Sequence, residues 1–266
     1  LSNDASILSY PGPAGANPVP DAAGTARLDR LARKANGAAT VEIPVGVGFC
    51  LFVRADCLAE TGAFRADVFA QGYGEENDFC LRARRLGWRH AAAPGVFVAH
   101  RAGASFGNAG AHLRRRNAAL LETLHPGYGA LVADFAARDP LAPHRAALDR
   151  ARFAAAGRPR QSAVALIAHA HGGGVERRIE AGAREWDARG VRPIVLRPAG
   201  DPAEGGVGVA DALGAEYPNL RFSPPGELPA LARLLRARRT VAVEIHYTLA
   251  LHPSILELPA KLGVPH

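Results

Sequence analysis

Three carboxylates stand within four residues of this chain, at Glu75, Glu76 and Asp78. They follow directly on a Gly72-Tyr73-Gly74 turn. Carboxylates packed this closely raise one another's pKa, as a general base that works near neutral pH requires. Flanking glycines also let a second molecule approach the backbone closely. The turn is therefore a candidate catalytic site with acid–base chemistry, and we expect Tyr73 and Gly74 to contact a substrate there.

A helix is predicted directly after the acids, and it would hold them in place. Phe79, Ala83 and Leu86 recur at i, i+4 and i+7, which is an apolar face of helical period. Gly87 stands where a helix C-cap falls, after arginines in the last turns. The carboxylates then lie at the N-terminus of this helix, on the loop side.

That position allows a purely structural interpretation as well. Acids at a helix N-terminus complement the macrodipole, each contributing about 0.3–1 kcal/mol. Asp78 and Arg82 have the i,i+4 spacing of a helical ion pair, worth a few tenths of a kcal/mol. Capping and catalysis both remain open from the residues alone.

Length and composition narrow the class of protein. The chain has 266 residues, 48% of them hydrophobic and 21% charged, which is typical of one large or two modest globular domains. No apolar run has the length of a membrane span. Cys50, Cys57 and Cys80 fit neither a disulfide framework nor a metal-binding pair, and we expect Cys50 and Cys80 to be buried. A reducing cytoplasm is the expected compartment.

The net charge of +7 is spread as arginine over predicted helices. No basic stretch is interleaved with aromatic residues, so nucleic-acid binding is not expected. A basic face suits a protein that handles nucleotide-sugar phosphates, or one that works at the periphery of an anionic membrane.

Several weaker signals surround the acids in the first half of the chain. We expect a short helix over 25–34 and a strand over 41–53 that is interrupted by Gly46-Val47-Gly48. Gly-x-Gly there indicates either a bulge or a close approach to a ligand. A second strand over 96–100 would end at His100, and a histidine in this place is either a hydrogen-bonding residue or a ligand.

The second half of the chain alternates strands and helices. Strands are predicted over 162–169, 191–196 and 240–246, with helices over 175–189 and 227–238. This alternation is typical of a parallel α/β sheet. We expect one domain over 1–135, a helical linker over 136–160 and a second domain over 161–266.

The stretch Gly74-Glu75-Glu76-Asn77-Asp78-Phe79-Cys80-Leu81-Arg82, followed by Gly87-Trp88, resembles the Glu-Asp motif of inverting, family-2-type glycosyltransferases with the GT-A fold. The resemblance implies that Glu76 is the catalytic base and that Glu75 helps to hold the acceptor hydroxyl. Under this interpretation Asp78 also orients the acceptor, and Trp88 either packs under the site or fills the core. Glutamate at position 76 departs from the aspartate that the family usually has.

The same resemblance extends to the flanking segments. It implies that Gly46, Val47 and Gly48 line the acceptor side of the cleft, and that His100 completes a site for a divalent metal, Mn²⁺ or Mg²⁺. The chain contains no Asp-x-Asp motif, with which the family holds that metal. Residues 1–135 would then be the C-terminal part of a GT-A domain whose nucleotide-binding strands lie upstream.

The segment His171-Gly172-Gly173-Gly174-Val175-Glu176, together with Arg189-Gly190-Val191, resembles the N-terminal half of family-4-type glycosyltransferases with the GT-B fold. The expected fold class is therefore α/β, a partial GT-A domain followed by a Rossmann-like half-domain of GT-B type. The resemblance implies a bacterial tandem enzyme, of which this chain is the junction.

The resemblance implies transfer of a sugar from a nucleotide-sugar donor to a glycan or lipid-linked glycan, in the cytoplasm or at the inner membrane. A non-catalytic sugar-binding or interaction module is the alternative, and the missing Asp-x-Asp favours it. A serine hydrolase is a second alternative, because Gly103-Ala104-Ser105-Phe106-Gly107 is a G-x-S-x-G pattern and an HGGG pattern begins at His171. Their order along the chain argues against a hydrolase that uses Ser105, since HGGG should come first.

Overall fold

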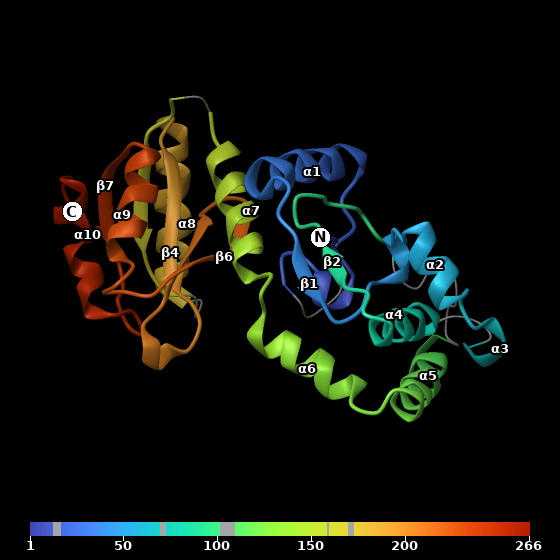
Figure 1. The fold of residues 1–266 in the computed structure, drawn as a ribbon. Coiled ribbons are helices and arrows are strands. Elements are labelled where there is room, and N and C mark those ends of the chain that lie inside the picture. The colour runs from blue at the N-terminus through green and yellow to red at the C-terminus, as the bar shows by residue number, and fades with distance from the viewer. Residues whose placement is uncertain (13–16, 70–72, 102–109, 159, 170–172) are drawn as a thin grey trace. The chain divides into compact units, whose positions relative to one another are not determined.

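The computed structural model describes residues 1–12, 17–69, 73–101, 110–158, 160–169 and 173–266; of Gly110 and Ala111 it describes the backbone alone. The chain divides into two compact units, Leu1–Leu148 and Asp149–His266 (Figure 1). The division falls inside one helix, α7, which runs over Ala142–Ala155. Each unit has its own buried core and is described by itself.

The first unit is built mainly of helices around a very small sheet. A 3₁₀ turn, η1, opens it at Ser6–Leu8, and a second, η2, lies at Gly48–Cys50. The remaining elements, besides the first part of α7, are α1 (Ala22–Asn36), β1 (Val41–Ile43), α2 (Ala55–Thr61), α3 (Ala66–Phe69), α4 (Glu75–Arg85), β2 (His90–Ala92), α5 (Gly110–Leu124) and α6 (Tyr128–Arg138).

The sheet of the first unit is shorter than the sequence predicts. β1 and β2 pair antiparallel over three residues each, from Val41 opposite Ala92 to Ile43 opposite His90. The strand predicted over 41–53 ends at Ile43, because proline and two glycines follow and the chain turns into η2. No strand forms over 96–100; within it, Val98 makes an isolated bridge to Ser2.

Helix α4 forms where the sequence predicts it and ends as predicted. Phe79 and Ala83 are buried as expected, whereas Leu86 is 49% exposed. Gly87 has a φ of +91°, and its N–H donates to the Arg84 carbonyl at 3.0 Å. The Trp88 N–H donates to the Ala83 carbonyl at 3.1 Å, which completes a Schellman motif.

The three cysteines are free thiols. Cys80 is buried on α4, as expected, and so is Cys57 on α2. Cys50 is exposed, so its predicted burial is wrong. It lies in η2 instead of a buried strand, because the glycines before it break the strand.

The second unit is a five-stranded sheet with helices. The strands are β3 (Ala163–Ile167), β4 (Arg192–Pro198), β5 (Val207–Asp211), β6 (Glu216–Phe222) and β7 (Thr240–Ile245). The helices that follow α7 are α8 (Gly173–Ala188), α9 (Leu228–Ala237) and α10 (Leu258–Leu262), with 3₁₀ turns η4 (Pro202–Glu204) and η5 (Pro253–Glu257). Among the described residues of the whole chain, no helix combines the length and the apolar character needed to cross a bilayer.

The strand order is β6-β5-β4-β3-β7, and the sheet is mixed. β3 pairs in parallel with both β4 and β7, as the sequence predicts. β5 and β6 were not predicted; they form a hairpin that adds antiparallel to β4. The expectation of a wholly parallel sheet is therefore wrong at this edge. The cause is local, because a turn of four residues joins β5 to β6 and leaves no room for a crossover helix.

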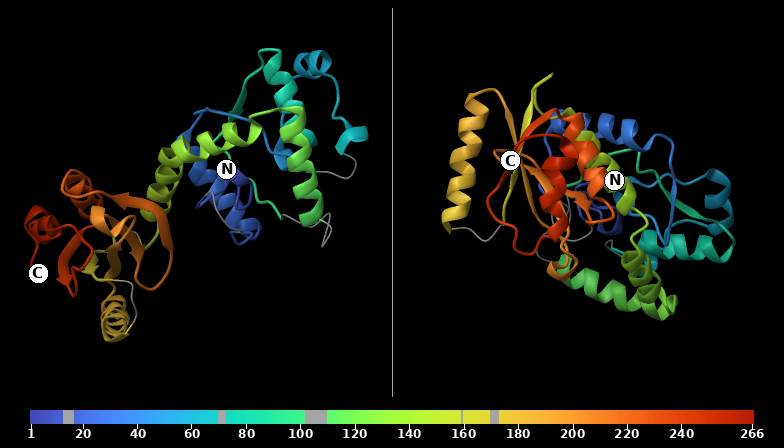
Figure 2. Two further views of the ribbon diagram at one scale, coloured as in Figure 1. Left: turned by 90° about the horizontal axis from the view of Figure 1, so that it is seen from below. Right: turned by 90° about the vertical axis from the view of Figure 1, so that its left-hand side faces the viewer.

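Helices cover both faces of this sheet (Figure 2). Side chains of β3 alternate between the faces, with Val164 and Leu166 packed against α8 residues such as Ile179. Ala165 and Ile167 belong to the opposite core, which includes leucines of α9 and α10. Both faces of β3 are therefore buried, which explains why its sequence is an unbroken apolar run.

Candidate active site

The turn that enters α4 has an unusual backbone. Tyr73 has a φ of +66° and Gly74 a φ of +120°. A side chain at Gly74 would lie 3.1 Å from Leu121 and 3.2 Å from Phe69, so the position requires glycine for space as well as conformation. Tyr73, by contrast, holds a left-handed conformation without being glycine, a strain of the kind that gathers at functional sites.

Tyr73 is tied to helix α5. The guanidinium of Arg114 lies 5.0 Å from the centre of the Tyr73 ring, and its Nη1 donates to the phenol oxygen at 3.1 Å. The combined cation–π contact and hydrogen bond fix the ring beside the start of α4. The phenol that we expect to contact a substrate is therefore already oriented by a neighbouring helix.

Glu76 lies in the first turn of α4, largely withdrawn from water. Burial raises the pKa of its carboxyl above the ordinary value, and the negative charge of Glu75 raises it further. The Gly74 N–H donates to Oε2 over a long 3.3 Å, so the carboxylate also takes part in capping the helix. A raised pKa and a capping contact are thus combined in one side chain.

Glu75 has a buried carboxylate oxygen, Oε2, without a hydrogen-bond partner among the described residues. A buried carboxylate oxygen normally accepts a hydrogen bond, because leaving it unsatisfied costs about 1–3 kcal/mol. Among the described residues, this oxygen therefore has an acceptor capacity that the protein does not use.

The Gly46-Val47-Gly48 segment lies against Glu76. A methyl group added at Gly48 would lie 3.5 Å from the Glu76 side chain, so the bare backbone packs against it. The Gly46 N–H donates to the Cys80 thiol at 3.3 Å, which anchors the same segment one helical turn further along α4. Next to it, the Phe49 ring stacks on His100 with 4.7 Å between the centroids.

His100 is held from two sides. Its backbone N–H donates to the Asn3 side chain at 2.8 Å, and its Nδ1 donates to the Asp4 carbonyl. This hydrogen bond leaves the lone pair on Nε2, the form of the ring that binds a metal. The described residues contain no group of three side chains that could hold a metal ion. His100 by itself does not complete the oxygen-rich coordination that Mg²⁺ or Mn²⁺ takes.

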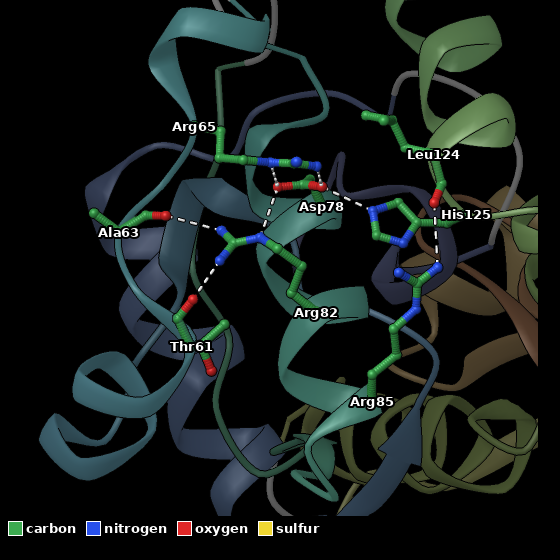
Figure 3. A network of polar contacts seen from close by, with 8 residues as sticks. All are labelled: Thr61, Ala63, Arg65, Asp78, Arg82, Arg85, Leu124 and His125. Atoms are coloured by element: carbon green, nitrogen blue, oxygen red, sulfur yellow. Dashed lines mark hydrogen bonds and ion pairs between the residues drawn. The ribbon is translucent and has the colours of Figure 1, made fainter.

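The surroundings of Asp78 do not suit the predicted role of orienting the acceptor. Its carboxylate is fully buried and accepts hydrogen bonds from Arg65, Arg82 and His125, the last at 2.7 Å (Figure 3). Burial would raise the pKa of Asp78, but these three partners lower it to about 2. A carboxylate with its oxygens occupied and no exposed surface is not available to orient an acceptor. Asp78 instead joins α4 to the segments that carry Arg65 and His125.

Arg82 extends this network. Its guanidinium donates to the Ala63 carbonyl at 2.8 Å and to the Thr61 carbonyl, besides the carboxylate of Asp78 (Figure 3). The i,i+4 spacing of Asp78 and Arg82 did predict their ion pair, which is therefore confirmed. Arg65 and His125 carried no signal in the sequence, because they lie 13 and 47 residues from Asp78.

Trp88 lies on another side of the Gly46-Val47-Gly48 segment. Its indole N–H donates to Glu60 at 2.8 Å, and the Arg54 guanidinium lies 5.6 Å from the ring centre. Trp88 lines an apolar cavity of about 530 Å³ together with Gly46 and Val47. Neither Glu75 nor Glu76 lines this cavity. This cavity is thus separate from the candidate acids.

Three sequence predictions fall outside the described residues. Gly72, which opens the turn, is one of them. Ser105, with the rest of its G-x-S-x-G pattern, and the first half of the HGGG pattern at His171 are the others. The structure therefore adds nothing to the hydrolase alternative.

Comparison with known proteins gives no further guide to this site. The chain matches no protein-family model, no curated protein and no solved structure. The candidate site consequently rests on its own geometry. Two neighbouring glutamates follow a strained turn, a glycine segment packs against one of them, and a histidine stacks on Phe49, directly after that segment.

Proposed function

We propose that the chain is part of a glycosyltransferase that transfers a sugar from a nucleotide-sugar donor to a hydroxyl group of a glycan or lipid-linked glycan. Its first unit would be the C-terminal part of a GT-A domain and its second unit the N-terminal part of a GT-B domain. The observation that carries the proposal is the buried Glu76 carboxyl, whose pKa is raised and whose neighbour is the bare backbone of Gly48. A general base works best when its pKa is raised toward the working pH.

The proposed reaction is a single displacement with inversion at the anomeric carbon. The acceptor hydroxyl donates a hydrogen bond to Glu75 or Glu76 as it approaches. Glu76 takes the hydroxyl proton while the acceptor oxygen forms a bond to the anomeric carbon. The bond from that carbon to the donor phosphate breaks at the same time, and the nucleoside diphosphate leaves with the electron pair.

Each described residue near the acids has a part in this proposal. Glu75 holds the acceptor hydroxyl through its unpartnered oxygen, and Gly48 keeps the approach to Glu76 open. Tyr73, fixed by Arg114, forms one wall of the entry. We place the reaction in the cytoplasm or at the inner face of a bacterial membrane, where nucleotide sugars and lipid-linked glycans meet.

The test is a Glu76→Gln variant, which keeps the shape of the side chain and removes the base. Release of nucleoside diphosphate from UDP-, GDP- and TDP-sugars is followed with lipid-extracted bacterial glycans as acceptors. Loss of a general base lowers turnover by about 100-fold or more. Asp67→Asn, an exposed acid on α3, is the matched control and keeps full turnover. Near-normal turnover of Glu76→Gln excludes Glu76 as the base.

A non-catalytic sugar-binding module is the second candidate, and the hydrogen bond from Gly74 to Glu76 favours it, because a capping role alone explains that contact. Titration of UDP, GDP and TDP against the protein by calorimetry, with Mn²⁺ present, separates the two. Binding of a nucleotide together with turnover supports the transferase. Glycan binding without nucleotide binding or turnover supports the module.

A further inference from the structure

A second, smaller pocket lies at the other end of α4 from Glu75. It has a volume of about 260 Å³ and is formed where the last turn of α4 meets the start of α6. Arg84 and Arg85 line it from α4, and His125, Gly127 and Tyr128 line it from the second side. It shares no lining residue with the 530 Å³ cavity, and none of the candidate catalytic residues belongs to it.

His125 is the central group of this pocket. Its side chain is only 5% exposed, and its Nε2 lies 2.7 Å from the Asp78 carboxylate. Because the pKa of Asp78 is about 2, that carboxylate is ionised and accepts a hydrogen bond, so Nε2 carries the hydrogen. Nδ1 is then the remaining polar atom of the ring. It is buried and has no protein partner among the described residues.

Two arginines give the pocket its charge. Arg85 Nη2 donates to the Leu124 carbonyl at 3.2 Å, which fixes the guanidinium next to His125 (Figure 3). Arg84 Nη1 lies 4.0 Å from Glu42, so that carboxylate offsets only part of the Arg84 charge. A guanidinium presents five N–H donors in one plane, and a single carbonyl contact leaves most of them available.

Glu122, an acid at the end of α5, is directed away from the pocket. Glu122 accepts hydrogen bonds from the Gly127 N–H at 2.7 Å and from the Gly129 N–H at 2.9 Å, and so caps the start of α6. It does not line the pocket. Two N–H groups at the N-terminus of α6 therefore already donate to a carboxylate of the protein itself.

We propose that this pocket binds a phosphate group, either inorganic phosphate or a phosphate monoester. The two guanidiniums take charged phosphate oxygens in charge-assisted hydrogen bonds. His125 Nδ1 accepts from the phosphate hydroxyl, or donates to a phosphate oxygen when the ring is doubly protonated. A tetrahedral oxyanion thus supplies the partner that Nδ1 lacks and neutralises the arginines at once. This inference does not depend on the proposed glycosyl transfer.

Binding at this pocket also acts on the rest of the unit. A bound phosphate holds His125, His125 holds Asp78, and Asp78 holds Arg65 and Arg82. These contacts connect α4 with the segments on both sides of it. Since phosphate binds only the folded site, it stabilises the folded unit by mass action.

Calorimetric titration with inorganic phosphate tests the proposal, at constant ionic strength maintained with chloride. The variant Arg84→Gln/Arg85→Gln removes both charges from exposed positions, so the fold is retained. We expect saturable binding to the parent protein and affinity at least about tenfold weaker in the variant. Arg138→Gln, at the far end of α6, is the control and leaves the affinity unchanged. Absence of saturable binding, or equal affinity in the double variant, overturns the proposal.

Two further measurements sharpen the result. The ¹⁵N chemical shift of His125 Nδ1 should change as phosphate is added, and an unchanged shift shows that the anion sits elsewhere. Titration with glycerol 1-phosphate distinguishes the sources of the ligand. Tighter binding of glycerol 1-phosphate than of phosphate identifies a monoester as the ligand, and tighter binding of phosphate identifies the free anion.

Discussion

Glu76 and Asp78 stand two residues apart on the first turn of α4, yet their surroundings have opposite effects on them. Asp78 is fully buried among three cationic or hydrogen-bonding partners, and its pKa is lowered to about 2. Glu76 is also largely withdrawn from water, but burial and the negative charge of Glu75 raise its pKa. Burial alone therefore does not decide the charge of a carboxyl group; its partners do.

The two side chains also serve different purposes as a result. The ion pairs of Asp78 fix it as a structural centre, because moving it would leave Arg65 and Arg82 without their counter-charge. The pKa of Glu76 is instead raised by burial and by the charge of Glu75, so its carboxyl holds a proton more tightly than an ordinary glutamate does. The same helical turn thus carries one carboxyl group whose pKa is lowered by its partners and another whose pKa is raised by burial.

The largest effect that we expect comes from Asp78→Asn. It removes the negative charge between two arginines and a histidine, and should lower the free energy of unfolding by about 3 kcal/mol. Urea denaturation measures the loss. Asp134→Asn breaks an exposed ion pair with Arg138 on α6 and should cost less than about 0.5 kcal/mol. Equal losses of unfolding free energy in the two variants would show that the buried ion pairs of Asp78 stabilise the fold no more than an exposed ion pair does.

A smaller effect is expected at the glycine that introduces both acids. An alanine at position 74 would have to keep a φ of +120°, and its Cβ would lie 3.1–3.3 Å from Leu121 and Phe69. Gly74→Ala should therefore lower the free energy of unfolding by about 2–3 kcal/mol. Gly87, at the other end of the same helix, has a φ of +91° but open space around it. Gly87→Ala should therefore lower the free energy of unfolding by about 1 kcal/mol. Thermal unfolding of both variants measures the difference. If Gly74→Ala is no worse than Gly87→Ala, the turn is not tightly packed against α5.

The smallest effect has the opposite sign. Because the pKa of Glu76 is raised in the folded protein, its charged form is disfavoured there, and stability falls as the pH rises through that pKa. Glu76→Gln should therefore slightly increase stability at pH 7 and have no such effect below pH 4.

For Asp78, with a folded pKa of about 2, the stabilising contribution is present above pH 4 and is lost as the pH falls toward 2. Unfolding measured across pH 2–8 for both variants shows whether the two profiles diverge in this way.

The local features of this molecule could be predicted well from the sequence. Helix α4, the role of Gly87 and the Asp78–Arg82 ion pair all depend on residues within a few positions of one another. The contact of Gly48 with Glu76 was anticipated only through the family resemblance. Periodicity and caps describe short stretches of chain, and they were reliable here for that reason.

Features that join distant segments could not be predicted in the same way. His125 carries no pattern that relates it to Asp78, 47 residues away, so the buried network and the role of Asp78 in it were missed. The hairpin of β5 and β6 was missed as well. Gly208 in β5 and Pro218 in β6 are weak strand formers, and the two strands are stabilised by pairing with β4 and each other, which is a tertiary effect.

The edges of the second unit's sheet have a consequence for how this protein behaves in solution. β6 is one edge, and Pro218 removes an N–H group that a strand of another molecule would need. β7 is the opposite edge, and there the Val243 N–H already donates to the Pro265 carbonyl of the C-terminal segment at 3.1 Å. Both edges are thus poor templates for a further strand, which protects the sheet from edge-to-edge aggregation at the concentrations that the binding experiments need.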